Sequence, residues 1–325
     1  MNDNDEAGNE AGTHVPLKKK KKKKKRTTEQ VMSENSLQII SGAELHRQQK
    51  ERILVYSRAG MGKSRFVLSI PQSWGKIGYY AADDNAWLLQ SISKRKRDRV
   101  VVIRPEGPDP TAQFMEFCNL DWDEIDPEVG TLVVDTYSKV AWDSISFSAN
   151  TLAIDREPHY IVGELGKGGI AIPNRGDYQG IDGLSKQYLH DLFKRYHDKH
   201  IIFVCHEESK DFDGEIVGGP QHPGRQMIDF LPGQFSTVIR LIRETMIVPG
   251  AEDLSAAVVA ITENDGKFVA KIRTDDEEAP NPMARIVLQR NPEHYWEMYE
   301  KFRNGELVVE APKKKKKKST STEGV

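Results

Sequence analysis

Residues 53–68 read ILVYSRAGMGKSRFVL, and this stretch decides the fold that the sequence predicts. Four apolar residues are followed by a glycine-containing loop, and a helix-like segment begins at Ser64. In such a strand–loop–helix unit, the loop amides and the start of the helix converge on an anion. Gly60 and Gly62 let the backbone approach a phosphate closely, and Lys63 brings a positive charge to it. We therefore expect a nucleotide-binding loop.

The loop follows the phosphate-binding pattern G-x-x-x-x-G-K-S/T (Walker A) except at its first position, where Ser57 replaces glycine. An ordinary glycine turn is the alternative, but the preceding strand and following helix favour phosphate binding. The hydroxyl of Ser64 suits the coordination shell of Mg²⁺. The residues expected to hold the nucleotide are Ser57, Arg58, Ala59, Gly60, Met61, Gly62, Lys63, Ser64 and, further along the chain, Asp135.

Short apolar runs alternate with helix-like segments along the chain. The runs at 53–56, 77–81, 100–103, 131–134 and 201–205 are typical of buried parallel strands. The segments at 63–70, 111–118 and 185–196 have the length and apolar spacing of crossover helices. This alternation predicts an α/β fold with a mainly parallel sheet flanked by helices. Further runs lie at 238–242, 256–262 and 267–273, and the turn Asp265-Gly266 predicts an antiparallel hairpin between the last two.

Polar residues follow three of the predicted strands. Asp135 follows 131–134, and a carboxylate there holds Mg²⁺ directly or through water, so Ser64 and Asp135 are the predicted metal ligands. Asp83 and Asp84 follow 77–81; we favour Asp84 as the group that orients an attacking water, and the start of a helix is the alternative. His206 follows 201–205 and is either a sensor of the γ-phosphate or a structural polar residue.

The last predicted strand contains Lys271-Ile272-Arg273, whose alternation puts the two cations on one face. They are placed to meet a phosphate held by a neighbouring subunit, and a solvated charged face is the alternative. Asp84, His206, Lys271 and Arg273 are thus the candidate catalytic residues.

Composition and charge divide the chain of 325 residues into a core and two tails. We expect an unstructured lysine-rich tail at 1–35, an ATPase domain at 36–275, an extension at 276–310 that packs on the core, and a second tail at 311–325. Residues 1–30 and 311–325 hold 15 Lys and Arg against 6 Asp and Glu, so a total of −2 leaves −11 for residues 31–310. The core therefore does not suggest nucleic-acid binding by bulk charge, whereas the tails either contact phosphates or are merely solvated.

No apolar run approaches the roughly 20 residues of a membrane span, so we expect no membrane partner and a cytoplasmic location. Cys118 and Cys205 lie far apart in apolar surroundings and are predicted to be buried free thiols. In the C-terminal extension, Trp296, Tyr299 and Phe302 have helical spacing and are expected to pack back on the core.

The order of these motifs resembles the RecA-like, AAA-annotated nucleotide-binding ATPases that bacteriophages encode. The similar pieces lie within about residues 50–275 and are 53–66, 79–84, 132–136, 176–178, 201–207 and 230–234. The resemblance implies a RecA-type core, ATP with Mg²⁺, and a role in phage DNA replication or recombination, some members being linked to single-strand annealing. It also implies a ring or filament with active sites between subunits, single-stranded DNA as partner, and the host-cell cytoplasm as location.

The chain departs from that family at two positions: Asp84 stands where glutamate is common, and Ser57 where the loop normally begins with glycine. The glycine-rich segment 160–180 either lines a DNA channel or is simply flexible. Two other functions remain open. A small-molecule kinase shares the loop and the sheet but usually carries an arginine-rich lid, which we do not find here. A non-enzymatic interaction module would bind ATP without turnover.

Overall fold

The computed structural model describes residues 50–83, 88–152, 161–162, 170–212, 215–224, 226–247, 254–273, 281–288 and 291–307, so both predicted tails lie outside the described residues. The strands are β1 (Arg52–Ser57), β2 (Lys76–Ala81), β3 (Val100–Ile103), β4 (Val129–Asp135), β5 (Ile161–Val162), β6 (Ile170–Ala171), β7 (His200–Phe212), β8 (Glu215–Pro220), β9 (Thr237–Ile247), β10 (Leu254–Ile261), β11 (Lys271–Ile272) and β12 (Arg285–Val287). The helices are α3 (Lys63–Val67), the short 3-10 helix η1 (Gln72–Trp74), α4 (Leu88–Ser91), α5 (Lys94–Arg97), α6 (Pro110–Asn119), α7 (Trp122–Ile125), α8 (Tyr137–Leu152), α9 (Arg175–Arg195), α10 (Met227–Gly233) and α11 (Glu293–Arg303).

A mixed, mostly parallel sheet forms the centre of the fold. Its strand order is β12-β10-β9-β1-β7-β4-β2-β3, with β11 also paired to β9 and β8 to β7. The six strands from β9 to β3 run parallel, while β8, β10, β11 and β12 join antiparallel. The predicted α/β class and mainly parallel sheet are confirmed. Strand β7 lies between β1 and β4, so the strand before the glycine loop and the strand ending at Asp135 are not neighbours.

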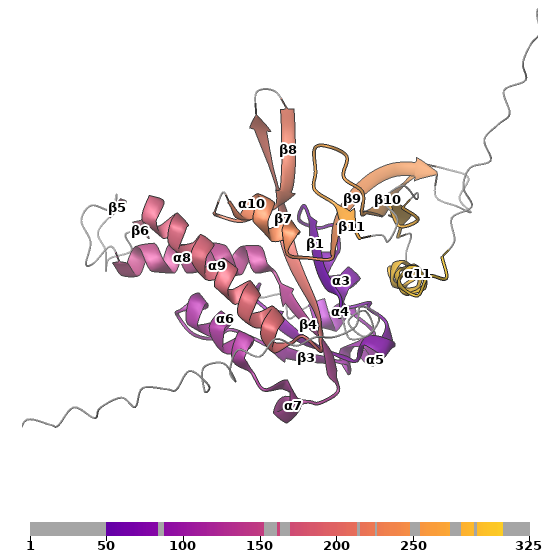
Figure 1. Ribbon diagram of the computed structural model, residues 1–325, viewed down its shortest axis with the longest axis horizontal. Coiled ribbons are helices and arrows are strands. Elements are labelled where there is room, and N and C mark those ends of the chain that lie inside the picture. Colours follow the sequence, from indigo (N-terminus) through magenta and orange to yellow (C-terminus); the bar gives the residue numbers. More distant parts are fainter. Residues whose placement is uncertain are drawn as a thin grey trace, which may run out of the picture. The chain divides into compact units, whose positions relative to one another are not determined.

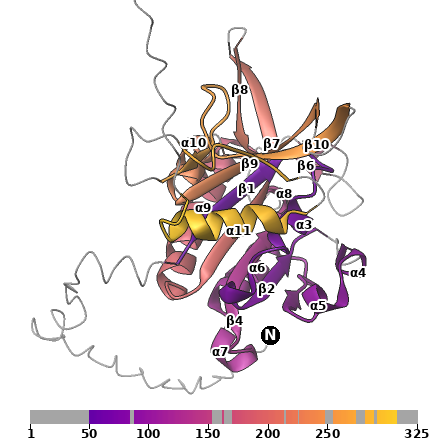
Figure 2. The ribbon, with the colours of Figure 1, turned by 90° about the vertical axis from the view of Figure 1, so that its right-hand side faces the viewer.

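Alternating side chains divide the core between the two faces of the sheet. Leu54 and Tyr56 of β1 belong to the apolar cluster that α6, α8, α9 and α10 cover, whereas Ile53 and Val55 belong to the cluster beneath α3 and α11. Figure 1 shows α6, α8 and α9 grouped on one side of the sheet and α11 on the other, and Figure 2 looks onto α11. Both faces are therefore buried, as a continuous apolar run such as 53–56 requires.

Helix α9 begins at Arg175, ten residues before the predicted start, so residues 175–180 are helical and not part of a glycine-rich loop. The cause is a capping box: the Asn174 side chain accepts hydrogen bonds from the amides of Gly176 and Asp177, and Asp177 accepts one from the amide of Asn174. These bonds outweigh the low helix propensity of glycine here. Residues 163–169, which include the predicted glycine cluster, lie outside the described residues.

The predicted hairpin between 256–262 and 267–273 is wrong, although its turn forms. Asp265 accepts hydrogen bonds from the amides of Lys267 and Phe268, and Gly266 has a φ of 81°, which is typical of a turn. However, β10 pairs with β9 along residues 240–247, and β11 pairs with the next stretch of β9, at 237–238. The hairpin partner of β10 is therefore β9, because that long strand offers one edge to both segments.

Helix α11 closes the other face through its aromatic side chains. The indole Nε1 of Trp296 donates to the Phe66 carbonyl at 3.0 Å, and the Tyr299 hydroxyl lies 2.9 Å from Thr237 Oγ1 and 2.8 Å from Glu51 Oε2. Phe302 packs at the edge of the same cluster. The extension thus packs directly on α3, the helix that follows the glycine loop.

Cys118 and Cys205 are buried and free, as predicted. None of the helices among the described residues is both long and apolar enough to cross a membrane.

Candidate functional site at the carboxyl edge of the sheet

The glycine loop, residues 58–62, joins the end of β1 to the start of α3. Gly60 has a φ of 76° and Gly62 a φ of 82°, a left-handed conformation that side chains with a Cβ rarely adopt. No atom lies within 4 Å of the Cβ that either position would carry, so the backbone conformation and not crowding calls for glycine. The sequence prediction of a tight loop between a buried strand and a helix is therefore reproduced.

Lys63, the first residue of α3, turns back into this loop. Its Nζ donates hydrogen bonds to the carbonyls of Ser57 at 3.1 Å and Arg58 at 3.2 Å, and only 6% of the residue is exposed. Burial lowers the pKa of the Lys63 ammonium, and the neighbouring Asp135 opposes that shift. The loop therefore holds a cation that faces only backbone carbonyls and nearby acidic groups.

Asp135 ends β4 and is 1% exposed. Its Oδ2 accepts a hydrogen bond from the Tyr79 hydroxyl at 2.5 Å, while Oδ1 has no hydrogen-bond partner among the described residues. Burial raises the pKa of Asp135, and the hydroxyls of Ser64 and Tyr79 together with the Lys63 ammonium counteract that rise. The peptide bond between Asp135 and Thr136 is cis.

A buried carboxylate oxygen without a partner, beside the Ser64 hydroxyl, has the chemistry of an Mg²⁺ ligand pair. The described residues contain no group of three or more His, Cys, Asp or Glu side chains that would hold a metal ion by themselves. A magnesium ion held by Ser64 and Asp135 would need further oxygen ligands, for which a bound phosphate and water are the usual source.

Asp83 meets His206 at the same edge. Asp83 Oδ2 lies 4.0 Å from His206 Nε2 and accepts a hydrogen bond from Thr136 Oγ1 at 3.3 Å. Burial lowers the pKa of His206, Lys63 lowers it further, and Asp83 partly restores it. Because β2 and β7 flank β4, the sheet itself brings these side chains beside Asp135.

The favoured candidate Asp84 lies outside the described residues, and Asp83 is the acid that is seen at the site. The sequence offered both as an adjacent pair, so the signal was present. The end of β2 fixes the position of Asp83: Ala81 pairs with Asp135, and the amide of Ala82 donates to the Asp135 carbonyl at 2.8 Å. That register directs Asp83 toward Thr136 and His206.

Sequence reasoning missed a buried carboxylate beside the loop. The Glu207 side chain, only 2% exposed, accepts two hydrogen bonds from Arg240 of β9, at 2.8 and 3.2 Å, and forms an ion pair with Arg58 Nε at 3.4 Å. The Arg240 guanidinium also lies over the Phe268 ring, 3.2 Å from its centroid. Arg58 is thereby tied to β7 and β9. No local pattern shows this, because the partners are far apart in sequence.

Lys271 and Arg273 do not meet the loop of their own chain. Lys271 pairs with Val238 of β9, and Val238 pairs with Leu54 of β1, so Lys271 lies level with Leu54. Because β11 runs antiparallel to β9, the chain then leads away from the edge that carries the loop. Burial lowers the pKa of Lys271, and Arg273 lowers it further, so the two cations lie near each other. Whether they reach another subunit remains a prediction.

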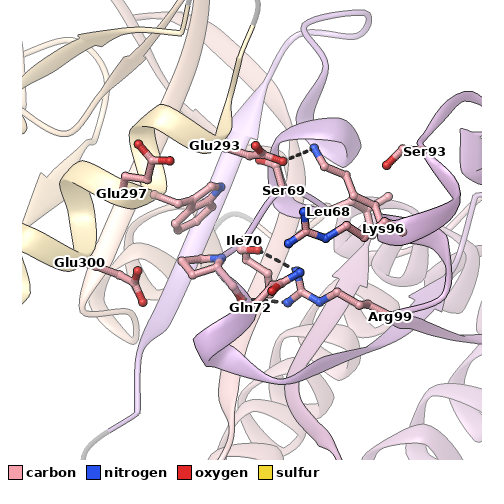
Figure 3. A pocket seen from close by; sticks show the side chains of 13 residues that line it. Leu68, Ser69, Ile70, Gln72, Ser93, Lys96, Arg99, Glu293, Glu297 and Glu300 are labelled. Carbon is pink, nitrogen blue, oxygen red and sulfur yellow. Dashed lines mark hydrogen bonds and ion pairs between the residues drawn. The ribbon is translucent and has the colours of Figure 1, made fainter.

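A hollow of about 310 Å³ lies away from this edge, where α5 faces α11 (Figure 3). Two of its three cations are engaged: Lys96 forms an ion pair with Glu293 at 2.7 Å, and Arg99 donates hydrogen bonds to the carbonyls of Ile70, Pro71 and Gly75. Arg95 is the third cation of the lining. Glu297 and Glu300 also line it. The Lys96–Glu293 ion pair joins α5 to α11. The three carboxylates of the lining balance its three cations, so the hollow does not favour a phosphate.

No protein-family model matches this chain, and no curated protein sequence matches it. The site is therefore interpreted from its own geometry: a glycine loop with a buried lysine, a buried aspartate beside a serine hydroxyl, and a pair formed by Asp83 and His206. Strands β1 and β4 end at this edge, whereas β7 continues past His206 to Phe212 and pairs there with β8.

Proposed function

We propose that this chain is a Mg²⁺-dependent ATPase with a RecA-like P-loop core, which acts in phage DNA replication, recombination or single-strand annealing. The observation that carries the proposal is the buried Lys63, whose ammonium is held at the centre of the loop next to Ser64 and Asp135. A buried cation whose hydrogen bonds go to the Ser57 and Arg58 carbonyls is suited to an anionic ligand, and the two left-handed glycines open the loop amides toward it.

The strand order supports the RecA-like part of the proposal. Because β7 is inserted between β1 and β4, His206 lies between the loop and Asp135, and Asp83 is on the far side. Three polar side chains thus surround the space next to the loop, where the terminal phosphate of a nucleotide would lie. Participation of phage DNA follows only from the resemblance of the motifs.

Each group has a distinct role in hydrolysis. The loop amides and Lys63 bind and orient the phosphates, and bound Mg²⁺, held by Ser64 and Asp135, would neutralise their charge. Asp83 accepts a hydrogen bond from the attacking water and orients it, as a carboxylate without its own cation can. His206, whose pKa is lowered by burial, is neutral at pH 7 and so adds a hydrogen-bonding group rather than a charge.

The test is steady-state ATP hydrolysis by the full chain with Mg²⁺, with and without single-stranded DNA, alongside ATP binding measured by calorimetry. Turnover that DNA stimulates and that Lys63→Ala abolishes is the expected result. ATP binding without turnover under both conditions would refute the ATPase and leave an interaction module that ATP locks. Absence of ATP binding would refute the site itself.

A mixing experiment tests the role of Arg273 between subunits. On the proposal, Arg273→Ala and Lys63→Ala are each inactive alone, and mixed assemblies regain turnover because some interfaces combine an intact loop with an intact Arg273. Full turnover by Arg273→Ala alone would leave Arg273 as a solvated surface cation, and mixtures that stay inactive would exclude its action on a neighbouring subunit.

A further inference from the structure

A second hollow, of about 470 Å³, opens at the end of β1 opposite the glycine loop. Its lining includes no carboxylate: it consists of the cations Arg52, Lys186 and Lys194, together with His190, Phe193, Phe230 and Gln234. Arg52 is the first residue of β1 and Ser57 the last, so about 16 Å of strand separates this hollow from the nucleotide loop. The two are separate sites.

Helix periodicity builds one wall of the hollow. Lys186, His190 and Lys194 follow one another at intervals of four residues on α9, which puts them on one face of the helix. Lys194 and His190 are exposed and Lys186 is half-buried. The opposite face of α9, with Leu189 and Leu192, is buried in the core, so the face that carries the three basic residues has a fixed position.

Aromatic rings hold two of the cations in place. The Arg52 guanidinium lies over the Phe193 ring, 4.3 Å from its centroid, and Lys186 Nζ lies 5.2 Å from the centroid of Phe230 on α10. Burial lowers the pKa of Arg52, which is the response expected of a charge that lacks a carboxylate partner. Such contacts orient the cations without neutralising them.

The cations of this hollow have no acidic partner at ion-pair distance within the part of the chain that the structure describes. Asp182 lies one helical turn from Lys186, and the Lys186 charge opposes the rise that burial causes in the Asp182 pKa, but the two side chains are not within ion-pair distance. The neutral acceptors that Arg52 and Lys186 reach are the Phe193 carbonyl at 3.5 Å and Gln226 Oε1 at 3.4 Å. The hollow between α5 and α11 differs, because its lining contains three carboxylates and Lys96 is paired with one of them. In a core of net charge −11 over residues 31–310, a hollow whose lining contains three cations and no carboxylate is suited to an anion from outside.

We propose that this hollow, which we call the α9 basic hollow, binds the phosphodiester backbone of single-stranded nucleic acid. Its cations are spaced along a helix face, which suits a ligand with repeated charges better than one phosphate ion. Its aromatic rings are already covered by Arg52 and Lys186, so recognition is by charge and not by base stacking, and binding does not depend on base sequence. The site does not require nucleotide at the glycine loop.

The experiment measures binding of a fluorescent oligothymidylate to the full chain by anisotropy, without nucleotide, from about 0.1 M to about 1 M salt. The variant Lys186→Gln/Lys194→Gln removes two phosphate contacts. Its matched control, Lys94→Gln/Arg97→Gln, removes two exposed cations from α5 on another part of the surface. The lysine tails are the same in all three proteins, so the difference reports the hollow alone.

Each phosphate contact to a single strand contributes about 0.7 to the slope of log affinity against log salt, so the double variant should lose about 1.4. That corresponds to about 25-fold weaker binding at about 0.1 M salt and no difference near about 1 M. The control should keep the wild-type slope. Equal losses in both variants would overturn the proposal in favour of diffuse surface charge.

An unchanged affinity for DNA would also overturn it. If polyglutamate then bound the wild type and not the Lys186→Gln/Lys194→Gln variant, the hollow would instead be assigned to an acidic protein segment. ATP binding of the double variant provides a separate readout. It should equal that of the wild type, so failure of the α9 basic hollow and failure of the nucleotide site cannot be confused.

Discussion

Replacing Lys63 with methionine separates the effect of its buried charge on stability from the effect on ATP affinity. Methionine matches the length and apolar stem of lysine but lacks the ammonium. Without ligand, the change leaves the Ser57 and Arg58 carbonyls without their donor, at a cost of about 1–3 kcal/mol, and removes a buried charge, which is favourable. These contributions oppose each other, so we expect the free energy of unfolding without ATP to change by about 1 kcal/mol or less.

ATP affinity, in contrast, should collapse. One charge about 4 Å from a phosphate charge contributes about 4 kcal/mol at an effective dielectric constant of about 20, or roughly three orders of magnitude in Kd. At ATP concentrations about 100 times the wild-type Kd, ligand binding stabilises the wild type by about 2.7 kcal/mol. For a domain of this size, that raises Tm by roughly 5–10 °C, whereas the variant should show almost no rise.

The assay is thermal unfolding with and without Mg²⁺ and ATP, followed by circular dichroism. Lys199→Met is the matched control: the Lys199 side chain is 8% exposed, and its Nζ donates to Val129 O at 3.1 Å and Asp123 Oδ1 at 3.3 Å. It precedes β7, at the edge of the sheet far from the loop. The control should have a lower Tm but keep the full ATP-induced rise. A full rise in Lys63→Met would refute the assignment of the loop.

Three further predictions test the site and the core. Asp83→Asn should lower turnover by about two to four orders of magnitude with ATP affinity retained, and the exposed Asp98→Asn should not; equal turnover in both would remove Asp83 from the mechanism. Gly78→Ala should destabilise the protein by about 1–3 kcal/mol in urea unfolding, because its Cβ would lie 2.6 Å from the Trp122 ring; unchanged stability would contradict that packing. Burial lowers the pKa of His222 to about 4, so only the unfolded chain takes up a proton there as the pH drops from 6.5 to about 4, and this should cost roughly 3 kcal/mol of stability. The buried His200, whose pKa is lowered to about 3, adds a loss of the same sign, so His222→Gln should remove only the His222 share; an unchanged slope in urea titrations would exclude His222 as a source.

The parts of this fold that sequence predicts are those fixed by local patterns. The runs around β1, β2, β3 and β4 are continuous and apolar because both faces of the sheet are covered, so their strands were found within about two residues. Helix α8 was not predicted, since it follows Asp135 after a single residue, without a turn signal to mark its start. The start of α9 was misplaced because glycines concealed a capping box.

Long-range pairing accounts for what sequence could not supply. The position of Asp83 depends on the register of β2 against β4, and the position of β11 depends on how much of the β9 edge β10 leaves free. The α9 basic hollow combines residues from β1, α9 and α10, which a linear search does not bring together. The net negative charge of residues 31–310 argued against nucleic-acid binding by the core, because a count over the whole core conceals one local group of cations.

The two proposed sites share β1, but that strand is a poor route between them. Both of its neighbours hold it in register along most of its length, so a displacement at Ser57 would have to break the sheet to reach Arg52. A second route leaves the sheet at His206, which pairs with Ser57 across β1 and β7. The His206 carbonyl accepts a hydrogen bond from the Gln221 amide at 2.7 Å, and the chain beyond Gln221 leads into α10. Phe230 of α10 and Gln234, the residue that follows it, line the α9 basic hollow, so any response of DNA binding to ATP is expected to pass through His206 and α10.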